Sequence, residues 1–168
     1  MKLLAYEVDK RSFLGIFNED ETWVYPISAA GMEYRSMKDL IREAGPSEME
    51  MLDYISKKAP GDVTGAAPVE EIKIVSPIPE PDQDIICLGI NYMDHAAESA
   101  RFQKEEFARP EKAIYFSKRV NRTNDPDGII PAHKNLTNQL DYEAELAVII
   151  KKDAKDVKPE EVKDYIFG

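Results

Sequence analysis

The sequence predicts an α+β fold with a β-rich core. Short segments rich in β-branched and aromatic residues outnumber helical segments. Strands and helices do not alternate in the order that builds a parallel sheet, and the sequence contains no internal repeat. Apolar residues make up 43% of the 168 residues, which is enough for a packed core.

Residues 1–70 are predicted to form a small α+β module that ends in a linker. Strands are expected at 3–8, 13–17 and 22–27, because β-branched and aromatic residues gather there. The polar residues 18–20 separate the last two strands and are typical of a turn.

Two helices are expected to follow these strands. Ser36 is the predicted N-cap of a short helix that Gly45-Pro46 ends. Ser47 and Glu50 have capping-box spacing, which predicts a second helix at 48–58. The prolines and glycines after it, in residues 59–68, indicate the linker.

Residues 71–168 are predicted to form a second region, the first part of a larger domain. Three prolines, Pro77, Pro79 and Pro81, favour an extended path at its start. The expected elements are strands at 72–75, 85–88, 113–116 and 141–152, a helix at 92–102, a loop at 103–111, a turn at 125–128 and a last helix that Pro159 begins.

Charge and cysteine content restrict the class of partner. The net charge of −10 argues against nucleic acid, because phosphate binding needs a clustered positive surface. No stretch approaches the ~20 apolar residues of a membrane span, and the first residues have no signal-peptide pattern. Cys87 is the only cysteine, and its apolar neighbours predict a buried core residue. We therefore expect a cytoplasmic protein without a membrane or nucleic-acid partner.

Two glutamates near the end of the chain are candidate metal ligands. Alternation along the predicted strand at 141–152 places Glu143 and Glu145 on one face. Two residues of strand rise separate them by about 6.6 Å, so the two carboxylates repel each other unless a cation lies between them. A hard ion such as Mg²⁺ suits these oxygen ligands. A solvated acidic face on an edge strand is the alternative, and spacing alone does not decide between them.

His95 and Glu98 are a second candidate pair. On the helix predicted at 92–102 they lie three residues apart and therefore on the same face. A carboxylate in that position orients the imidazole, which suits a general base that activates water. A surface histidine with a helix ion pair is the commoner explanation of such spacing.

Other polar residues carry weaker signals. Lys118, Arg119 and Arg122 follow a predicted strand and suit an anionic substrate, although a solvated basic loop is the commoner arrangement. The sequence at 125–128 is acidic but lacks the ligand spacing of a calcium-binding loop. His133 stays unassigned.

Taken together, three motifs make the chain resemble the fumarylacetoacetate hydrolase family. They are Gly89-Ile-Asn-Tyr-x-x-His-x-x-Glu98, Pro110 through Phe116-Ser-Lys118, and Asp141-Tyr-Glu-Ala-Glu-Leu146. The early module is similar to the N-terminal extension of many bacterial members. The resemblance implies that residues 71–168 are the first part of a mixed β-roll catalytic domain.

The resemblance also implies roles for individual residues. Glu143 and Glu145 correspond to metal ligands for Mg²⁺ or Mn²⁺, and His95 with Glu98 corresponds to the acid–base dyad. Tyr92 and Lys118 correspond to residues beside the substrate.

The implied substrates are small anionic 2-oxo or 1,3-dicarbonyl acids. Family members hydrolyse a carbon–carbon bond, decarboxylate, or isomerise an enol, as in aromatic catabolism. The expected assembly is a homo-oligomer with two subunits.

Family members continue beyond the region that matches this chain and add an aspartate metal ligand. We therefore expect a C-terminally truncated chain that holds two of three metal ligands. The alternative function is a non-catalytic family paralogue that acts as a binding or interaction module, since an incomplete sheet exposes unpaired strand edges.

Overall fold

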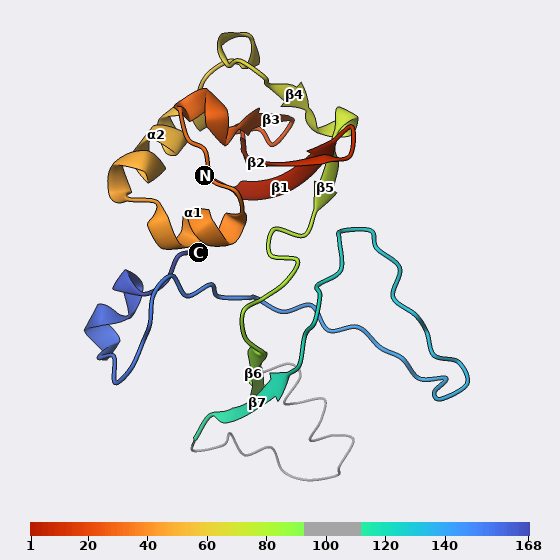
Figure 1. The fold of residues 1–168 in the computed structure, drawn as a ribbon. Coiled ribbons are helices and arrows are strands. Elements are labelled where there is room, and N and C mark those ends of the chain that lie inside the picture. Colours follow the sequence, from red (N-terminus) through yellow and green to blue (C-terminus); the bar gives the residue numbers. More distant parts are fainter. Residues whose placement is uncertain (93–111) are drawn as a thin grey trace. The chain divides into compact units, whose positions relative to one another are not determined.

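The computed structural model describes residues 1–92 and 112–168 (Figure 1). The described residues form two compact units, Met1–Ile78 with Asn124–Gly168, and Pro79–Thr123. The predicted division into 1–70 and 71–168 remains a prediction. Within the described part of the chain, no helix has the length and apolar character needed to cross a membrane.

The first unit is built on a five-stranded antiparallel sheet with the order β4-β3-β2-β1-β5. The strands are β1 (Leu3–Val8), β2 (Arg11–Phe17), β3 (Trp23–Pro26), β4 (Ala67–Pro68) and β5 (Lys73–Val75). The predicted turn at 18–20 is confirmed. Its first residue, Asn18, accepts hydrogen bonds from the N–H groups of Thr22 and Trp23, both at 2.9 Å.

The predicted linker contributes to this sheet and to its core. Residues 59–68 contain β4 and a short 3-10 helix at Pro60–Asp62. Val63 between these elements is buried. β5 pairs with β1 although the sequence separates them by more than sixty residues.

Both predicted helices are present, but the second begins earlier than expected. Helix α1 spans Met37–Glu43, and Ser36 Oγ accepts the Asp39 N–H at 3.2 Å, which confirms the predicted cap. Helix α2 spans Pro46–Ser56 with Gly45 as its N-cap, so the predicted range 48–58 is wrong. Pro46 suits the first turn because its missing N–H would have no partner there.

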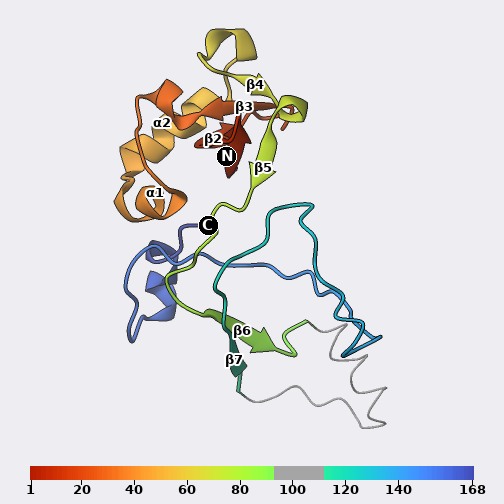
Figure 2. The same ribbon diagram turned by 45° about the vertical axis from the view of Figure 1, so that its right-hand side comes forward.

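The helices cover one face of the sheet (Figures 1 and 2). The core on this face contains Ile16 and Tyr25 from the strands with Leu40 and Leu52 from the helices. The opposite face carries a smaller cluster around Leu4, Tyr6 and Val24. Alternation along the strands explains the two layers, since Tyr25 and Val24 are neighbours that point to opposite faces.

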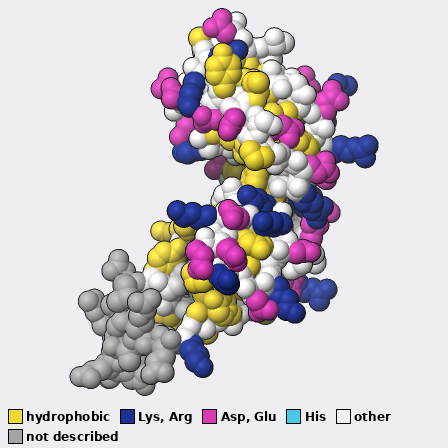
Figure 3. All heavy atoms as spheres, turned by 90° about the vertical axis from the view of Figure 1, so that its left-hand side faces the viewer, with side chains coloured by type: hydrophobic (Ala, Val, Ile, Leu, Met, Phe, Trp, Pro, Cys, Tyr) yellow, Lys and Arg dark blue, Asp and Glu magenta, His cyan; other side chains and the backbone are white. Residues whose placement is uncertain are grey.

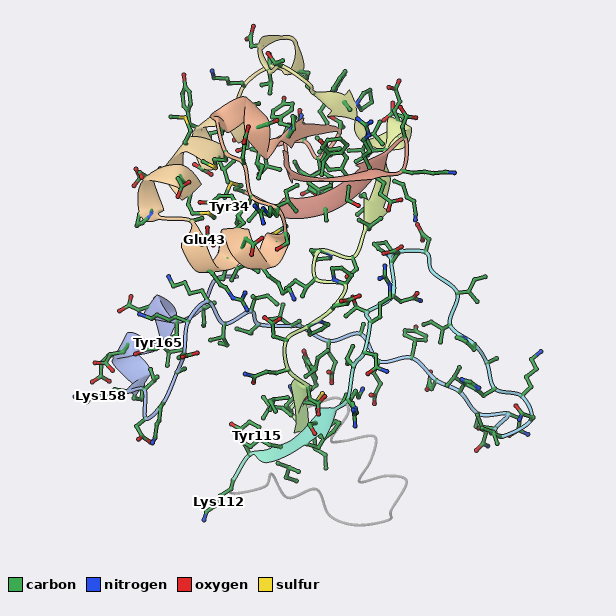
Figure 4. The ribbon with its side chains drawn as sticks, viewed as in Figure 1. Tyr34, Glu43, Lys112, Tyr115, Lys158 and Tyr165 are labelled. Atoms are coloured by element: carbon green, nitrogen blue, oxygen red, sulfur yellow. The ribbon has the colours of Figure 1, made fainter. Side chains whose placement is uncertain are left out.

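Glu48 gives this unit a predicted dependence on pH. Its carboxylate accepts the Gly45 N–H at 2.9 Å and the Tyr34 hydroxyl at 2.7 Å, and these two bonds lower the pKa of Glu48. The hydrogen bond to Glu48 raises the pKa of Tyr34, and the negative charge of nearby Glu43 adds to this effect (Figure 4).

A carboxyl group whose pKa is lowered by folding stabilises the protein at pH values above its ordinary pKa of 4.5. This stability is lost as the pH falls through the pKa of the folded state. We expect the urea midpoint of the wild type to fall more steeply between about pH 5 and pH 3 than that of Glu48→Gln. Glu50→Gln is the control, because its carboxylate accepts neither bond and its curve should parallel the wild type. Equal slopes for wild type and Glu48→Gln would contradict the prediction.

The predicted strand at 141–152 is wrong. Residues 141–149 have no regular secondary structure, and the segment makes a single β-bridge, between Ile150 and Ile166. A strand needs a neighbouring strand for its backbone N–H and C=O groups, and among the described residues no strand pairs with 141–148. The last predicted helix forms as a 3-10 helix at Pro159–Asp164.

The end of the chain folds back on residue 149. Ile149 donates its N–H to the Gly168 carbonyl at 2.8 Å, and its own carbonyl accepts the Phe167 N–H at 2.7 Å. The side chains of Ile149 and Phe167 then pack against the core cluster of the first unit.

Candidate functional site

The second unit is organised by an antiparallel pair of strands. Strand β6 spans Ile85–Gly89 and strand β7 spans Ile114–Lys118, close to the predicted ranges. Gly89 lies opposite Ile114 at one end of the pair, and Ile85 lies opposite Lys118 at the other. The pair therefore connects two of the three sequence motifs by backbone hydrogen bonds.

Two predicted substrate residues lie at opposite ends of this pair. Tyr92 is in a bend three residues after β6, beyond the end where Gly89 meets Ile114. Lys118 is the last residue of β7, at the other end. Four residues of strand rise separate these ends, which is about 13 Å. Along the chain, Tyr92 and Lys118 therefore belong to opposite ends of the strand pair.

Lys118 has an exposed side chain whose ammonium lies 6.0 Å from the centre of the Phe116 ring. This distance is at the limit of a cation–π contact. The next basic side chain in the loop, Arg119, is exposed as well, and Arg122 pairs with Glu80 at 3.8 Å. Lys118 and Arg119 are therefore placed where an anionic ligand can approach.

Both faces of the strand pair expose apolar side chains. Ile86 and Tyr115 are 68% and 66% exposed on one face, and Phe116 is 46% exposed on the other. Cys87 is the exception, since it is buried as predicted. Figure 3 shows hydrophobic side chains at the surface among acidic and basic ones. An isolated pair of strands is marginally stable, so these faces are of the kind that further elements cover.

Glu143 and Glu145 lie in the first unit, in the segment without regular structure. Both are exposed, and their neighbours Tyr142 and Leu146 are 86% and 83% exposed. The two glutamates thus stand among apolar side chains that a folded domain normally buries.

The donor atoms of this pair fit Mg²⁺ or Mn²⁺. Magnesium prefers oxygen ligands, keeps several waters, and is often held by one or two carboxylates together with an anionic substrate. Within residues 1–92 and 112–168, no group of three or more Asp, Glu, His or Cys side chains is arranged to hold a metal ion. Because residues 141–149 form no strand, the predicted placement of Glu143 and Glu145 on one strand face does not hold. Among the described residues, no third side chain of these types joins them as a metal ligand.

His95 and Glu98 lie outside the described residues, as does most of the helix predicted at 92–102. The predicted role of this pair remains a prediction. His133 lies in an exposed part of the chain.

Asp125 has a structural role that the sequence did not indicate. Its side chain accepts the Ser76 N–H at 3.0 Å and pairs with Lys73 at 3.5 Å. Its carbonyl accepts the Gly128 N–H at 3.0 Å, which confirms the predicted turn. Asp125 thus attaches this turn to the segment that follows β5, a contact between residues far apart in the sequence.

Comparison with known proteins identifies related chains. The family model for the fumarylacetoacetate (FAA) hydrolase C-terminal domain matches residues 84–168, which contain all the predicted site residues. The chain is 38% identical to a protein named oxaloacetate tautomerase YisK from Bacillus subtilis, over all of this chain and 58% of that protein. It is 28% identical to an uncharacterized protein of Staphylococcus epidermidis, over all of this chain and 57% of that one.

A solved structure matches as well. It is a fumarylacetoacetate hydrolase from the psychrophilic bacterium Exiguobacterium antarcticum, with a TM-score of 0.64 and 25% identity. The match covers all of this chain and 53% of that one. It confirms the predicted fold class, and the chain spans little more than half the length of these relatives.

Proposed function

Because this chain belongs to the fumarylacetoacetate hydrolase family, we propose that it contributes to a metal-dependent enzyme acting on small 2-oxo or 1,3-dicarbonyl acids. The similarity to a protein named oxaloacetate tautomerase is the observation that carries the substrate class. It favours keto–enol isomerisation of a 2-oxo dicarboxylic acid. Hydrolysis of a carbon–carbon bond and decarboxylation of the same class of acid are the related reactions.

Glu143 and Glu145 would hold Mg²⁺ or Mn²⁺ in this proposal. The ion, when bound, supplies a positive charge that polarises a carbonyl oxygen of the substrate. Lys118, whose ammonium is exposed at the end of β7, would hold a carboxylate of the substrate. Tyr92 would contact the substrate as well.

His95 and Glu98 would move the proton. In isomerisation, His95 takes a proton from the carbon next to the carbonyl, and the carbonyl oxygen gains a proton to give the enol. In hydrolysis, the same imidazole takes a proton from the attacking water. Glu98 favours the protonated imidazole and so stabilises the charge that His95 acquires in either case.

The proposed enzyme is a homodimer in the cytosol. A homodimer would cover apolar side chains such as Ile86 and Tyr115 that this chain leaves exposed. The single buried thiol of Cys87 suits the reducing cytosol.

Replacing His95 tests the proposed chemistry. We expect His95→Ala to lower kcat/KM by about 10²- to 10⁴-fold in the presence of Mg²⁺, since that is the usual contribution of a general base. The assay follows the enol of oxaloacetate by its ultraviolet absorbance, with pyruvate release and acylpyruvate hydrolysis measured in parallel.

His133→Ala is the matched control, because it removes the other histidine from an exposed position. We expect its kcat/KM to stay close to that of the wild type. If the wild type catalyses none of these reactions, the proposal fails and a binding module without catalysis is favoured.

A further inference from the structure

Ile90 has an unusual backbone conformation. Its φ of 53° lies in the left-handed region, directly after strand β6. Other non-glycine residues with positive φ include Asp9, Asp127 and His133, whose residue types adopt this region more readily. Among the described residues, Ile90 is the one β-branched residue in this conformation. Such a residue is a genuine outlier, because its branched Cβ crowds the backbone there.

Neither burial nor local sequence explains an isoleucine in this position. The side chain of Ile90 is 43% exposed, so packing in a core does not hold it. Glycine, which adopts the left-handed region freely, stands one residue earlier at Gly89. At Gly89 an added Cβ would meet Ile114 at an ordinary distance of 3.5 Å, and no positive φ demands glycine there. The left-handed conformation therefore occurs at the β-branched Ile90, although the preceding glycine would adopt it without strain.

The conformation of Ile90 determines how the chain leaves the strand pair. Gly89 is the last residue of β6 and pairs with Ile114. A left-handed residue immediately after it turns the backbone away from the ladder. Asn91 and Tyr92 follow this turn, so their direction depends on Ile90.

We propose that Ile90 is a positioning residue whose strained backbone fixes the path of the chain from β6 into the segment that carries Tyr92. Residues with a strained backbone gather at functional sites. Isoleucine has fewer accessible backbone conformations than glycine. A glycine at this position would therefore let the chain leave β6 in many directions. The inference rests on the proposed function, because the positioned residue Tyr92 is the one assigned to the substrate.

Two replacements at Ile90 distinguish the effect of the left-handed turn from the effect of backbone flexibility. Ile90→Gly permits the left-handed conformation and many others, so we expect kcat to fall by about tenfold or more through loss of alignment, with KM little changed. Ile90→Asn favours the left-handed region without a branched Cβ, so we expect it to keep kcat within about threefold of the wild type. The thermal midpoint of Ile90→Asn should equal or exceed that of the wild type, because strain is removed. Kinetics are measured with oxaloacetate and Mg²⁺.

Two matched controls complete the experiment. Ile129→Gly removes an isoleucine that is 88% exposed and has no positive φ, and Gly89→Ala adds a methyl group that has room. Both should keep the kcat of the wild type.

The inference is overturned if Ile90→Gly keeps the kcat of the wild type, if Ile90→Asn loses as much kcat as Ile90→Gly, or if Ile90→Asn melts below the wild type. An inactive wild type would instead overturn the proposed function, and this inference with it.

Discussion

Replacing Glu143 and Glu145 together by alanine is expected to abolish binding of Mg²⁺ and Mn²⁺ and, with it, activity on 2-oxo acids. These residues are the proposed ligands, and carboxylates are the ligands that a hard cation such as Mg²⁺ prefers. Loss of a residue that only orients a ligand already costs 10- to 100-fold in metal affinity, so loss of both ligands should cost more than about 100-fold. Isothermal titration with each metal measures the effect.

A control variant must remove two negative charges at another place in the chain. Glu70 and Glu71 are adjacent, exposed glutamates in a 3-10 helix of the first unit. Replacing them by alanine also takes the net charge from −10 to −8, because two carboxylates are lost. We expect this variant to bind both metals as the wild type does. Equal weakening in the two double variants would show that general electrostatic attraction, and no site at Glu143 and Glu145, holds the ion.

Single replacements test the two proposed ligands one at a time. Glu143→Gln and Glu145→Gln keep the size of the side chain and remove one charge each. We expect each to weaken binding, because a neutral amide is a poorer ligand for Mg²⁺ than a carboxylate. A wild type that binds neither metal would contradict the assignment itself.

Gly15→Ala is expected to destabilise the first unit by about 3 kcal/mol, at the upper end of the usual cost of overpacking. A Cβ at this position would lie 2.8 Å from Val24 Cγ1, 2.9 Å from the Tyr25 carbonyl oxygen and 2.9 Å from Tyr6 Cε1. All three neighbours are buried, and one of the three atoms belongs to the backbone of β3. The methyl group therefore cannot be accommodated by rotating one flexible side chain.

Urea unfolding, followed by the signal of the single tryptophan Trp23, measures this loss of stability. Gly61→Ala is the matched control, because no atom lies within 4 Å of its Cβ position and its φ is not positive. We expect the control to change the free energy of unfolding by less than about 0.5 kcal/mol. A Gly15→Ala variant as stable as the control would show that the sheet has room for the methyl group and would contradict the prediction.

Features governed by neighbouring residues were predicted well from the sequence. Ser36 was predicted as an N-cap, and the turn after β2 depends on Asn18, which bonds to N–H groups four and five residues away. Strands β6 and β7 also lie close to their predicted ranges, because their apolar runs end at clear breaks in the sequence. Each of these features depends on interactions over a few residues.

Errors arose where a distant partner or a competing cap decided the outcome. Ser47 and Glu50 were predicted to cap α2, whereas Gly45 is its N-cap and Glu48 accepts the Gly45 N–H. The predicted linker contributes β4, which exists because β3 presents an edge to pair with. Residues 141–152 have strand-like alternation, but alternation supplies no hydrogen-bond partner.

The sequence by itself determined the family and the α+β class, because these depend on motifs and on local hydrophobic patterns. It also determined which residue types are available for chemistry, namely carboxylates, a histidine and a lysine. Only the tertiary structure decided that β5 joins β1, that Asp125 attaches to the segment after β5, and that Ile90 turns the chain out of β6 in a strained conformation. The physical reason is that pairing and strain depend on groups brought together by folding, which residue order does not display.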